Sequence, residues 1–203
     1  LLGLVALGLA LAGPVVAVQA EQAGPFELGQ KFVTEHKVKS LVGPSVQIDD
    51  AGIISLAWME EDKDVRSVLY ARSTAPGGPM GSPVRINRPE EIPYWRQEAP
   101  ALTVADNDVF VTWGLAHPKA TPQQPFATEL RLSRSTDGGR SFQPSIAVND
   151  DPGVIQHTFD ALHRDAEGRL HLSWIDGRDG KKDPGTYVAR SLDAGATVTK
   201  NIK

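Results

Sequence analysis

The fold of this chain is indicated by a turn sequence near its middle, Ser135-Thr136-Asp137-Gly138-Gly139-Arg140-Ser141-Phe142. In such a run the Ser and Asp side chains can satisfy nearby backbone N–H groups, and Gly accepts the positive φ of a tight turn. The final aromatic residue can pack beneath a sheet. The run therefore predicts a hairpin turn between two strands, and we expect Asp137 to stabilise that turn instead of acting on a ligand.

A second copy of this turn lies later in the chain, and a degenerate one lies earlier. The later copy, residues 191–198, keeps Ser191, Asp193, Gly195 and Thr197 at the corresponding places. The earlier one, residues 73–80, keeps only its first Ser and its Gly. Turns that recur in phase with the strands around them indicate an internal repeat.

The strands around these turns repeat with them. Each unit has a strand, a tight turn rich in Asp, Asn or Gly, and a second strand that ends in Trp58, Trp113 or Trp174. Third strands follow at residues 67–73, 129–135 and 186–191, and fourth strands at 83–87, 145–149 and 197–202. Four short antiparallel strands repeated at this spacing are typical of propeller blades. We predict an all-β fold with blades at about 44–87, 99–149 and 158–203.

The turn matches the Asp-box pattern S-x-D-x-G-x-[ST]-[WF], and on these residues the chain resembles the sialidase superfamily of Asp-box (BNR-repeat) β-propellers over about residues 40–203. The resemblance implies a propeller of six four-stranded antiparallel blades, of which this chain supplies about three. It also implies that the Asp-boxes are structural turns on the face away from the active site.

Composition excludes several classes of function. The 203 residues carry 25 acidic and 21 basic side chains, a net charge of −4, which does not suit nucleic-acid binding. The absence of Cys excludes disulfides and thiolate metal sites. We expect no cofactor and no metal. The sequence leaves the oligomeric state open.

The N-terminal segment has the composition of an export signal. Residues 1–20 carry no charge, are rich in Leu, Ala, Gly and Val, and end in the small-residue pattern Val18-Gln19-Ala20. We therefore expect a signal peptide over 1–20 that is clipped at its start, an N-terminal segment over 21–39, and an exported protein, periplasmic or extracellular, with no membrane span after cleavage. A retained membrane anchor is the alternative.

The loops on the rim opposite the Asp-boxes are long and polar, which favours a binding site there. The expected loop 59–66 gathers the carboxylates of Glu60, Glu61, Asp62 and Asp64, and close like charges can create a general acid. The resemblance places the acid/base aspartate of sialidases near Asp62 or Asp64. A solvated acidic loop is the other interpretation. The family's carboxylate-binding Arg has no counterpart, because Val42 stands at its position.

Two further stretches are candidates for ligand contact. The crossing between the first two blades contains Tyr94, Trp95 and Arg96, which suit a sugar platform or, alternatively, a packed plug between blades. The loop of the third blade begins Asp176-Gly177-Arg178-Asp179. Its acidic spacing is similar to that of a calcium loop, but Arg178 occupies a ligand position, and we predict no metal there. The predicted ligand contacts are Glu60, Tyr94, Trp95, Arg96, Asp176 and Arg178.

Three functions remain open from the sequence. The first is an exported propeller that binds a glycan or similar polar ligand, with or without hydrolysis. The second is an exo-sialidase type of glycoside hydrolase that uses Asp62 or Asp64. The third is a non-catalytic scaffold or assembly propeller.

Overall fold

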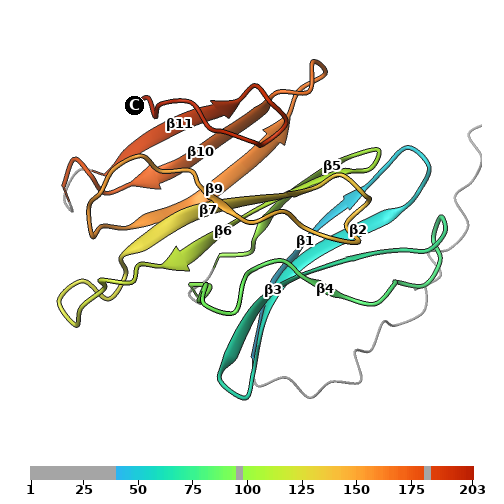
Figure 1. Ribbon diagram of the computed structural model, residues 1–203, viewed down its shortest axis with the longest axis horizontal. Coiled ribbons are helices and arrows are strands. Elements are labelled where there is room, and N and C mark those ends of the chain that lie inside the picture. Colours follow the sequence, from blue (N-terminus) through green and yellow to red (C-terminus); the bar gives the residue numbers. More distant parts are fainter. Residues whose placement is uncertain (1–39, 95–97, 181–183) are drawn as a thin grey trace, which may run out of the picture. The chain divides into compact units, whose positions relative to one another are not determined.

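The computed structural model describes residues 40–94, 98–180 and 184–203, which form eleven strands in three antiparallel sheets and contain no helix (Figure 1). The predicted all-β class is confirmed. The first sheet has the order β1 (Ser40–Ile48), β2 (Ile54–Asp62), β3 (Val65–Arg72), β4 (Val84–Arg85). The second has the order β5 (Ala101–Ala105), β6 (Asp108–Ala116), β7 (Thr128–Ser135), β8 (Ile146–Ala147). The third has the order β11 (Gly185–Ser191), β10 (Leu170–Asp176), β9 (His157–Arg164).

The fourth strands are shorter than the sequence predicts. In the third sheet the predicted strand 197–202 is reduced to a single bridge between Val188 and Ile202. Other contacts of this segment lie next to that bridge. The backbone N–H of Asn201 donates to Asp150 at 3.0 Å, and its side-chain oxygen accepts from the Asp150 N–H at 2.8 Å. These bonds tie the end of the chain to the crossing before β9, while the Thr199 N–H still donates to the Arg190 carbonyl of β11 at 2.7 Å.

The three tryptophans occupy equivalent positions, as the repeat predicts. Each lies in the second strand of its sheet and pairs with a third-strand residue, in the pairs Trp58–Leu69, Trp113–Arg131 and Trp174–Tyr187. Each third-strand partner lies four residues before the Ser that opens the following turn. The register of the repeat is therefore the same in all three sheets.

The first strand of every sheet is interrupted opposite its tryptophan. In β1 the insert is Gly43-Pro44, and in β9 it is Phe159-Asp160. In the second sheet Ala101 pairs with Thr112 and the next bridge joins Pro93 to Leu115, so the insert is residues 94–100. Such bulges bend a strand and re-aim its side chains, and they often lie next to active sites.

Two hydrophobic cores join the sheets. One lies between the first and second sheets and includes Met59, Val68 and Trp113. The other lies between the second and third and includes Phe110, Leu130 and Trp174. Trp113 and Trp174 are buried because each packs in the core shared with the preceding sheet. Trp58 is only half-buried, because its sheet has no preceding sheet within the described residues.

The turn at residues 135–142 is closed by its own side chains. The Ser135 hydroxyl accepts from the Gly139 N–H at 2.9 Å, and Asp137 accepts from the N–H and hydroxyl of Ser141 at 3.0 and 2.6 Å. Ser191, Asp193, Gly195 and Thr197 repeat every one of these bonds.

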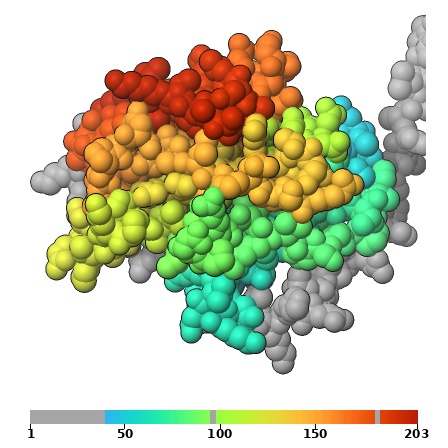
Figure 2. Space-filling view, viewed as in Figure 1, coloured from blue at the N-terminus to red at the C-terminus, as the bar shows by residue number. Residues whose placement is uncertain are grey.

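Gly139 has a further role in packing the sheets together. Its φ is 85°, and a Cβ there would lie 2.0 Å from the ring of Tyr70 in the first sheet. The Phe142 ring meets the same Tyr70 edge-on, with 5.5 Å between ring centroids. The gold band of chain in Figure 2, which runs from this turn into β8, lies on the surface of the molecule.

The prediction of a long loop over residues 59–66 is wrong. β2 and β3 continue to Asp62 and Val65, and only Lys63 and Asp64 form the turn, with φ of 46° and 67°. Positive φ at both central residues is the pattern of a tight hairpin. The acidic side chains therefore alternate between the two faces of a strand, and Glu61 is buried in an ion pair with Arg66 at 2.9 Å.

No helix among the described residues combines the length and the apolar character that crossing a bilayer would require. The predicted signal peptide over 1–20 and the segment 21–39 lie outside these residues, and both stay predictions.

Candidate carboxylate site at the first-strand bulges

Two carboxyl groups from different sheets meet where the first strands bulge. Glu98 belongs to the insert of the second sheet and Asp160 to that of the third. Thr112 in β6 donates its hydroxyl hydrogen to Asp160, which fixes this carboxyl against the second sheet. The backbone N–H of Phe159 faces Glu98 and acts to lower the pKa of its carboxyl group. The two inserts therefore hold the two acids close enough to interact.

Burial and proximity alter the acidity of both groups. Burial raises the pKa of Glu98 to about 7, and the charge of Asp160 adds to this rise, while the hydrogen bond from Phe159 opposes it. Burial also raises the pKa of Asp160 above its ordinary value, although the hydrogen bond from Thr112 opposes the change. A carboxyl group with a pKa of about 7, as in Glu98, retains its proton over part of the neutral range, and this is what a general acid requires.

The bulge that presents Asp160 is strained. Phe159 has a φ of 54°, which an aromatic residue rarely adopts, and its side chain is 65% exposed. A conformation of this kind costs roughly 1–3 kcal/mol and persists only where the surroundings fix it. It turns the Phe159 side chain to solvent while Asp160 faces Thr112.

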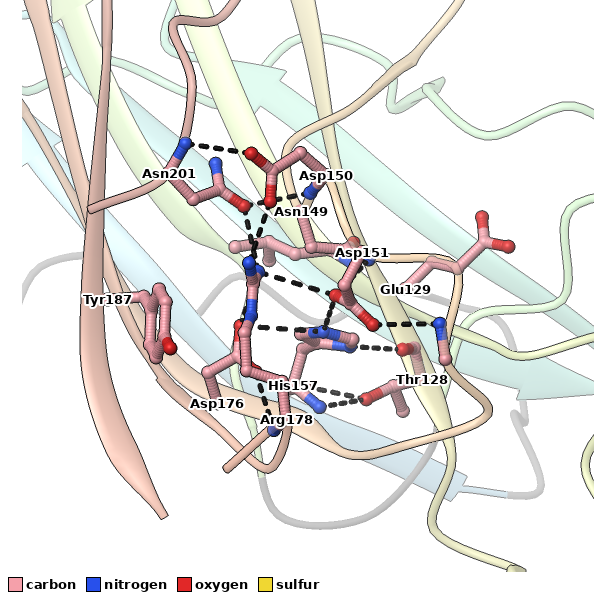
Figure 3. A network of polar contacts seen from close by, with 12 residues as sticks. Thr128, Glu129, Asn149, Asp150, Asp151, His157, Asp176, Arg178, Tyr187 and Asn201 are labelled. Carbon is pink, nitrogen blue, oxygen red and sulfur yellow. Dashed lines mark hydrogen bonds and ion pairs between the residues drawn. The ribbon is translucent and has the colours of Figure 1, made fainter. Parts of the chain in front are cut away.

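A buried polar network fixes the chain just before this bulge (Figure 3). The His157 backbone N–H donates to the Thr128 hydroxyl at 2.8 Å, and that hydroxyl donates to the His157 carbonyl at 2.7 Å. The ring Nδ1 of His157 lies 2.5 Å from the Thr128 carbonyl, and its Nε2 lies 2.7 Å from the Asp151 carboxyl. Both ring nitrogens are thus occupied, and the start of β9 is held in one position.

Arg178 lies at the centre of the same network. Its guanidinium donates to Asp150 at 2.7 Å, to Asp176 at 2.8 Å and to Asn201 at 2.9 Å, and it lies 4.2 Å from the centre of the Tyr187 ring. Asp176 is fully buried. Burial alone would raise the pKa of Asp176, but the hydrogen bonds from Arg178 and the Trp174 indole outweigh it and leave this pKa lowered.

The network has the donor set of a metal site but is already occupied by a cation. Single ligand atoms of Asp151, His157 and Asp176 lie within 4.8 Å of one another. However, the Arg178 Nη2 lies 3.4 Å from Asp151 and 2.8 Å from Asp176. The guanidinium takes the place in which a metal ion would neutralise these carboxylates.

The predicted site residues are distributed over several places. Asp62 and Asp64 are exposed at the β2–β3 hairpin, and Asp64 lines a small polar hollow with Glu61 and Arg66. Glu60 accepts a hydrogen bond from the Trp58 indole at 3.4 Å. The catalytic assignment of Asp62 and Asp64 and the ligand role of Glu60 stay predictions.

The predicted aromatic platform is described only in part. Tyr94 is buried beside Gly114, and its backbone N–H donates to the Gly114 carbonyl at 2.8 Å. Trp95 and Arg96 lie outside the described residues. Asp176 and Arg178 do come together, and their polar groups bond to each other and to neighbouring side chains. Their predicted role in ligand contact stays a prediction.

Glu98 and Asp160 were not singled out from the sequence. They lie in inserts of different length, and nothing in the local sequence of one points to the other. One signal was present. The stretch from His157 to Leu162 breaks the alternation of β9 at Phe159-Asp160, and a break of this kind indicates a bulge.

Comparison with known proteins gives a fold but no family. No protein-family model matches the sequence, and no curated protein matches it. Among solved structures, a Hadza microbial sialidase matches with a TM-score of 0.55 at 17% identity, over 78% of this chain and 36% of that one. A Dyadobacter fermentans protein of unknown function matches with a TM-score of 0.57 at 18% identity, over 83% of this chain and 52% of that one. A Penicillium chrysogenum α-L-arabinanase, complexed with arabinobiose, matches with a TM-score of 0.51 at 12% identity, over 78% of this chain and 49% of that one.

These likenesses show the fold alone. The chain has the propeller-type arrangement of antiparallel sheets found in glycoside hydrolases, and it spans about half or less of the length of these structures. The predicted fold class is confirmed at this level. The narrower assignment to the sialidase superfamily stays a prediction.

Proposed function

We propose that this chain is part of an exported carbohydrate-active propeller, which binds a glycan on the rim opposite the turn at residues 135–142. Glu98 and Asp160 act there on the glycosidic bond. The observation that carries the proposal is the pair of neighbouring carboxyl groups of raised pKa on adjacent first-strand bulges. Glycoside hydrolysis commonly uses two carboxyl groups, one protonated and one ionised.

The roles follow from the surroundings of each acid. Glu98, with a pKa of about 7, holds a proton that it can give to the leaving oxygen. Asp160 is fixed by Thr112, and once ionised it is suited to stabilise positive charge on the sugar or to direct a water molecule. The scaffold around them is rigid, because buried groups fix both the start of β9 and Thr112.

The test is a set of chromogenic neutral glycosides and a fluorogenic sialoside, assayed with the wild-type protein and three variants. Glu98→Gln and Asp160→Asn remove one acid each, and Glu90→Gln, an exposed acid on the preceding crossing, is the control. We expect Glu98→Gln to lower kcat by roughly 10²–10⁴-fold on a neutral glycoside. Full activity in both acid variants would overturn the catalytic part of the proposal.

The alternative hydrolase is a sialidase that uses Asp62 or Asp64 as acid/base. Sialoside turnover that is lost in Asp62→Ala or Asp64→Ala, and kept in Glu98→Gln, would favour it. Binding without turnover of any glycoside would favour a lectin-like propeller. A scaffold protein would show neither binding nor turnover.

A further inference from the structure

An apolar groove of about 500 Å³ opens beside the bulge of β9. Its walls come from three segments on the same rim: the end of the β6–β7 loop, the crossing before β9, and the β10–β11 loop. The side chains that dominate it are Pro125, Phe126, Ile155, Phe159, Ile175 and Pro184. Phe126 is 42% exposed and Phe159 is 65% exposed.

The polar groups of this groove are neutral. Gln123, Gln124 and Gln156 line it together with Thr158, and none of its described lining residues carries a charge. Aromatic faces suit the C–H faces of a sugar ring, and amides both donate to and accept from hydroxyl groups. A carboxylate ligand would need a bidentate guanidinium, and the described lining holds none.

The conformation of Phe159 connects the groove to the carboxyl pair. Its side chain lines the groove, its backbone N–H lowers the pKa of Glu98, and the next residue is Asp160. Its positive φ is unfavourable, and an exposed ring recovers little of that cost by packing in the protein. A strained and exposed aromatic residue next to Asp160 is better explained by ligand contact than by stability.

We propose that this groove binds one uncharged sugar unit of the glycan and thereby places the adjoining glycosidic bond at Glu98 and Asp160. The inference rests on the proposed function and adds the substrate class, a neutral glycan. The Phe159 ring stacks on the sugar, and the glutamine amides hydrogen-bond its hydroxyls.

The test is calorimetric titration of the protein with neutral oligosaccharides (arabinotriose, xylotriose, mannotriose and cellotriose) and with two anionic ones, sialyllactose and trigalacturonate. We expect at least one neutral sugar to bind and both anionic sugars to bind more than tenfold more weakly. Phe159→Ala should weaken the neutral sugar about tenfold or more, the size of effect expected for a lost aromatic contact.

Phe159→Gly and Val188→Ala complete the set of variants. Phe159→Gly removes both the ring and the strain, so we expect lost affinity with an unchanged or raised Tm. Val188→Ala trims another exposed apolar side chain, on β11, and should leave binding unchanged. A drop in Tm in both Phe159 variants would show instead that the ring stabilises the fold, and this would overturn the proposal.

The outcomes separate this inference from the proposed function. Binding of no neutral sugar, equal binding of the anionic sugars, or full affinity in Phe159→Ala overturns the groove assignment, whatever Glu98→Gln does to turnover. Conversely, Phe159-dependent binding of a neutral sugar with no turnover of any glycoside supports the groove and overturns the catalytic role of the acids.

Discussion

The indole Nε1 of Trp174 donates a hydrogen bond to the fully buried carboxylate of Asp176, two residues later, at 2.8 Å. The same relationship recurs in the first sheet, where Trp58 donates to Glu60 at 3.4 Å. In the second sheet the equivalent residue is Leu115, and the buried Trp113 Nε1 has no partner among the described residues. An unsatisfied buried donor costs about 1–3 kcal/mol.

Replacing Leu115 by Gln should therefore stabilise the protein. The amide oxygen would accept from Trp113, and we expect the free energy of unfolding to rise by about 0.5–1.5 kcal/mol relative to Leu115→Met, which has a similar length and no comparable acceptor. Denaturant unfolding of the two variants measures the difference. Equal stability would show that Trp113 already has a partner.

Asp137→Ala should lower stability without affecting glycan binding. Hydrogen bonds from Ser135 and Ser141 hold the pKa of Asp137 well below its usual range, and the substitution leaves the Ser141 N–H without its acceptor. By analogy with helix caps, the cost should be about 0.5–2 kcal/mol. Asp137→Asn keeps one acceptor oxygen and should cost less. A loss of ligand affinity at unchanged Tm would contradict the structural role.

Gly139→Ala should destabilise the protein far more than Gly138→Ala. Both positions have positive φ, 85° and 75°, so both pay the conformational cost of about 1 kcal/mol. At Gly138 the added methyl would lie 3.2 Å from the end of the Arg72 side chain and 3.5 Å from Asn107, whereas at Gly139 it would enter the Tyr70 ring. Overpacking should add about 1–3 kcal/mol there. Thermal unfolding of the two variants side by side checks the ranking, and similar losses would refute it.

The raised pKa of Glu98 predicts a pH-dependent stability. In the folded state this pKa is about 7, against an ordinary value of 4.5, so between these pH values the folded protein binds more protons than the unfolded chain. Stability from this group is complete below about pH 4.5 and is lost as the pH rises through 7. Tm measured from pH 5 to 8 should fall less steeply in Glu98→Gln than in the wild type.

Asp160, whose pKa is also raised, contributes in the same direction, so the Glu98→Gln, Asp160→Asn double variant should show the flattest profile. Parallel Tm profiles in the wild type and all three variants would mean that neither acid holds a proton in the folded state near pH 7.

Arg178→Ala should be strongly destabilising. Removing the guanidinium leaves the buried Asp176 without its main cation, and breaking a buried ion pair in this way costs about 3–5 kcal/mol. Arg178→Lys should recover little, because an ammonium cannot donate in a planar fork to Asp150, Asp176 and Asn201 together. Arg190→Ala, on the exposed face of β11, is the control. A small loss in Arg178→Ala would show that the network does not anchor β9.

The parts of the fold that repeat could be predicted from the sequence. The turns at Asp137 and Asp193 and the phase of the tryptophans depend on local chemistry and on alternation, both of which are visible in a single chain. The prediction of a loop around Asp62 failed because a run with four acidic residues resembles a solvent-exposed loop. The strand persists there because Arg66 pairs with Glu61 on one face, a contact across the hairpin that polarity alone does not reveal.

The candidate site depends on contacts between repeats, which the sequence does not display. Glu98 and Asp160 meet only because the inserts opposite Trp113 and Trp174 bend towards a common place. The pKa of Glu98 likewise reflects burial and the charge of Asp160, which belongs to the third sheet. Neither effect leaves a mark in the residues adjacent to Glu98.

The inserts opposite the tryptophans separate the candidate carboxylate site from the two hydrophobic cores. In all three sheets the residue after the insert pairs with the residue that precedes the tryptophan, although the insert of the second sheet is longer than the other two. New chemistry can therefore be added at an insert without repacking a core. Gly43, in the insert of the first sheet, has free space around it, because a Cβ there would meet nothing within 4 Å. A functional group introduced at Gly43 is the simplest route by which evolution or engineering could change the specificity of this scaffold.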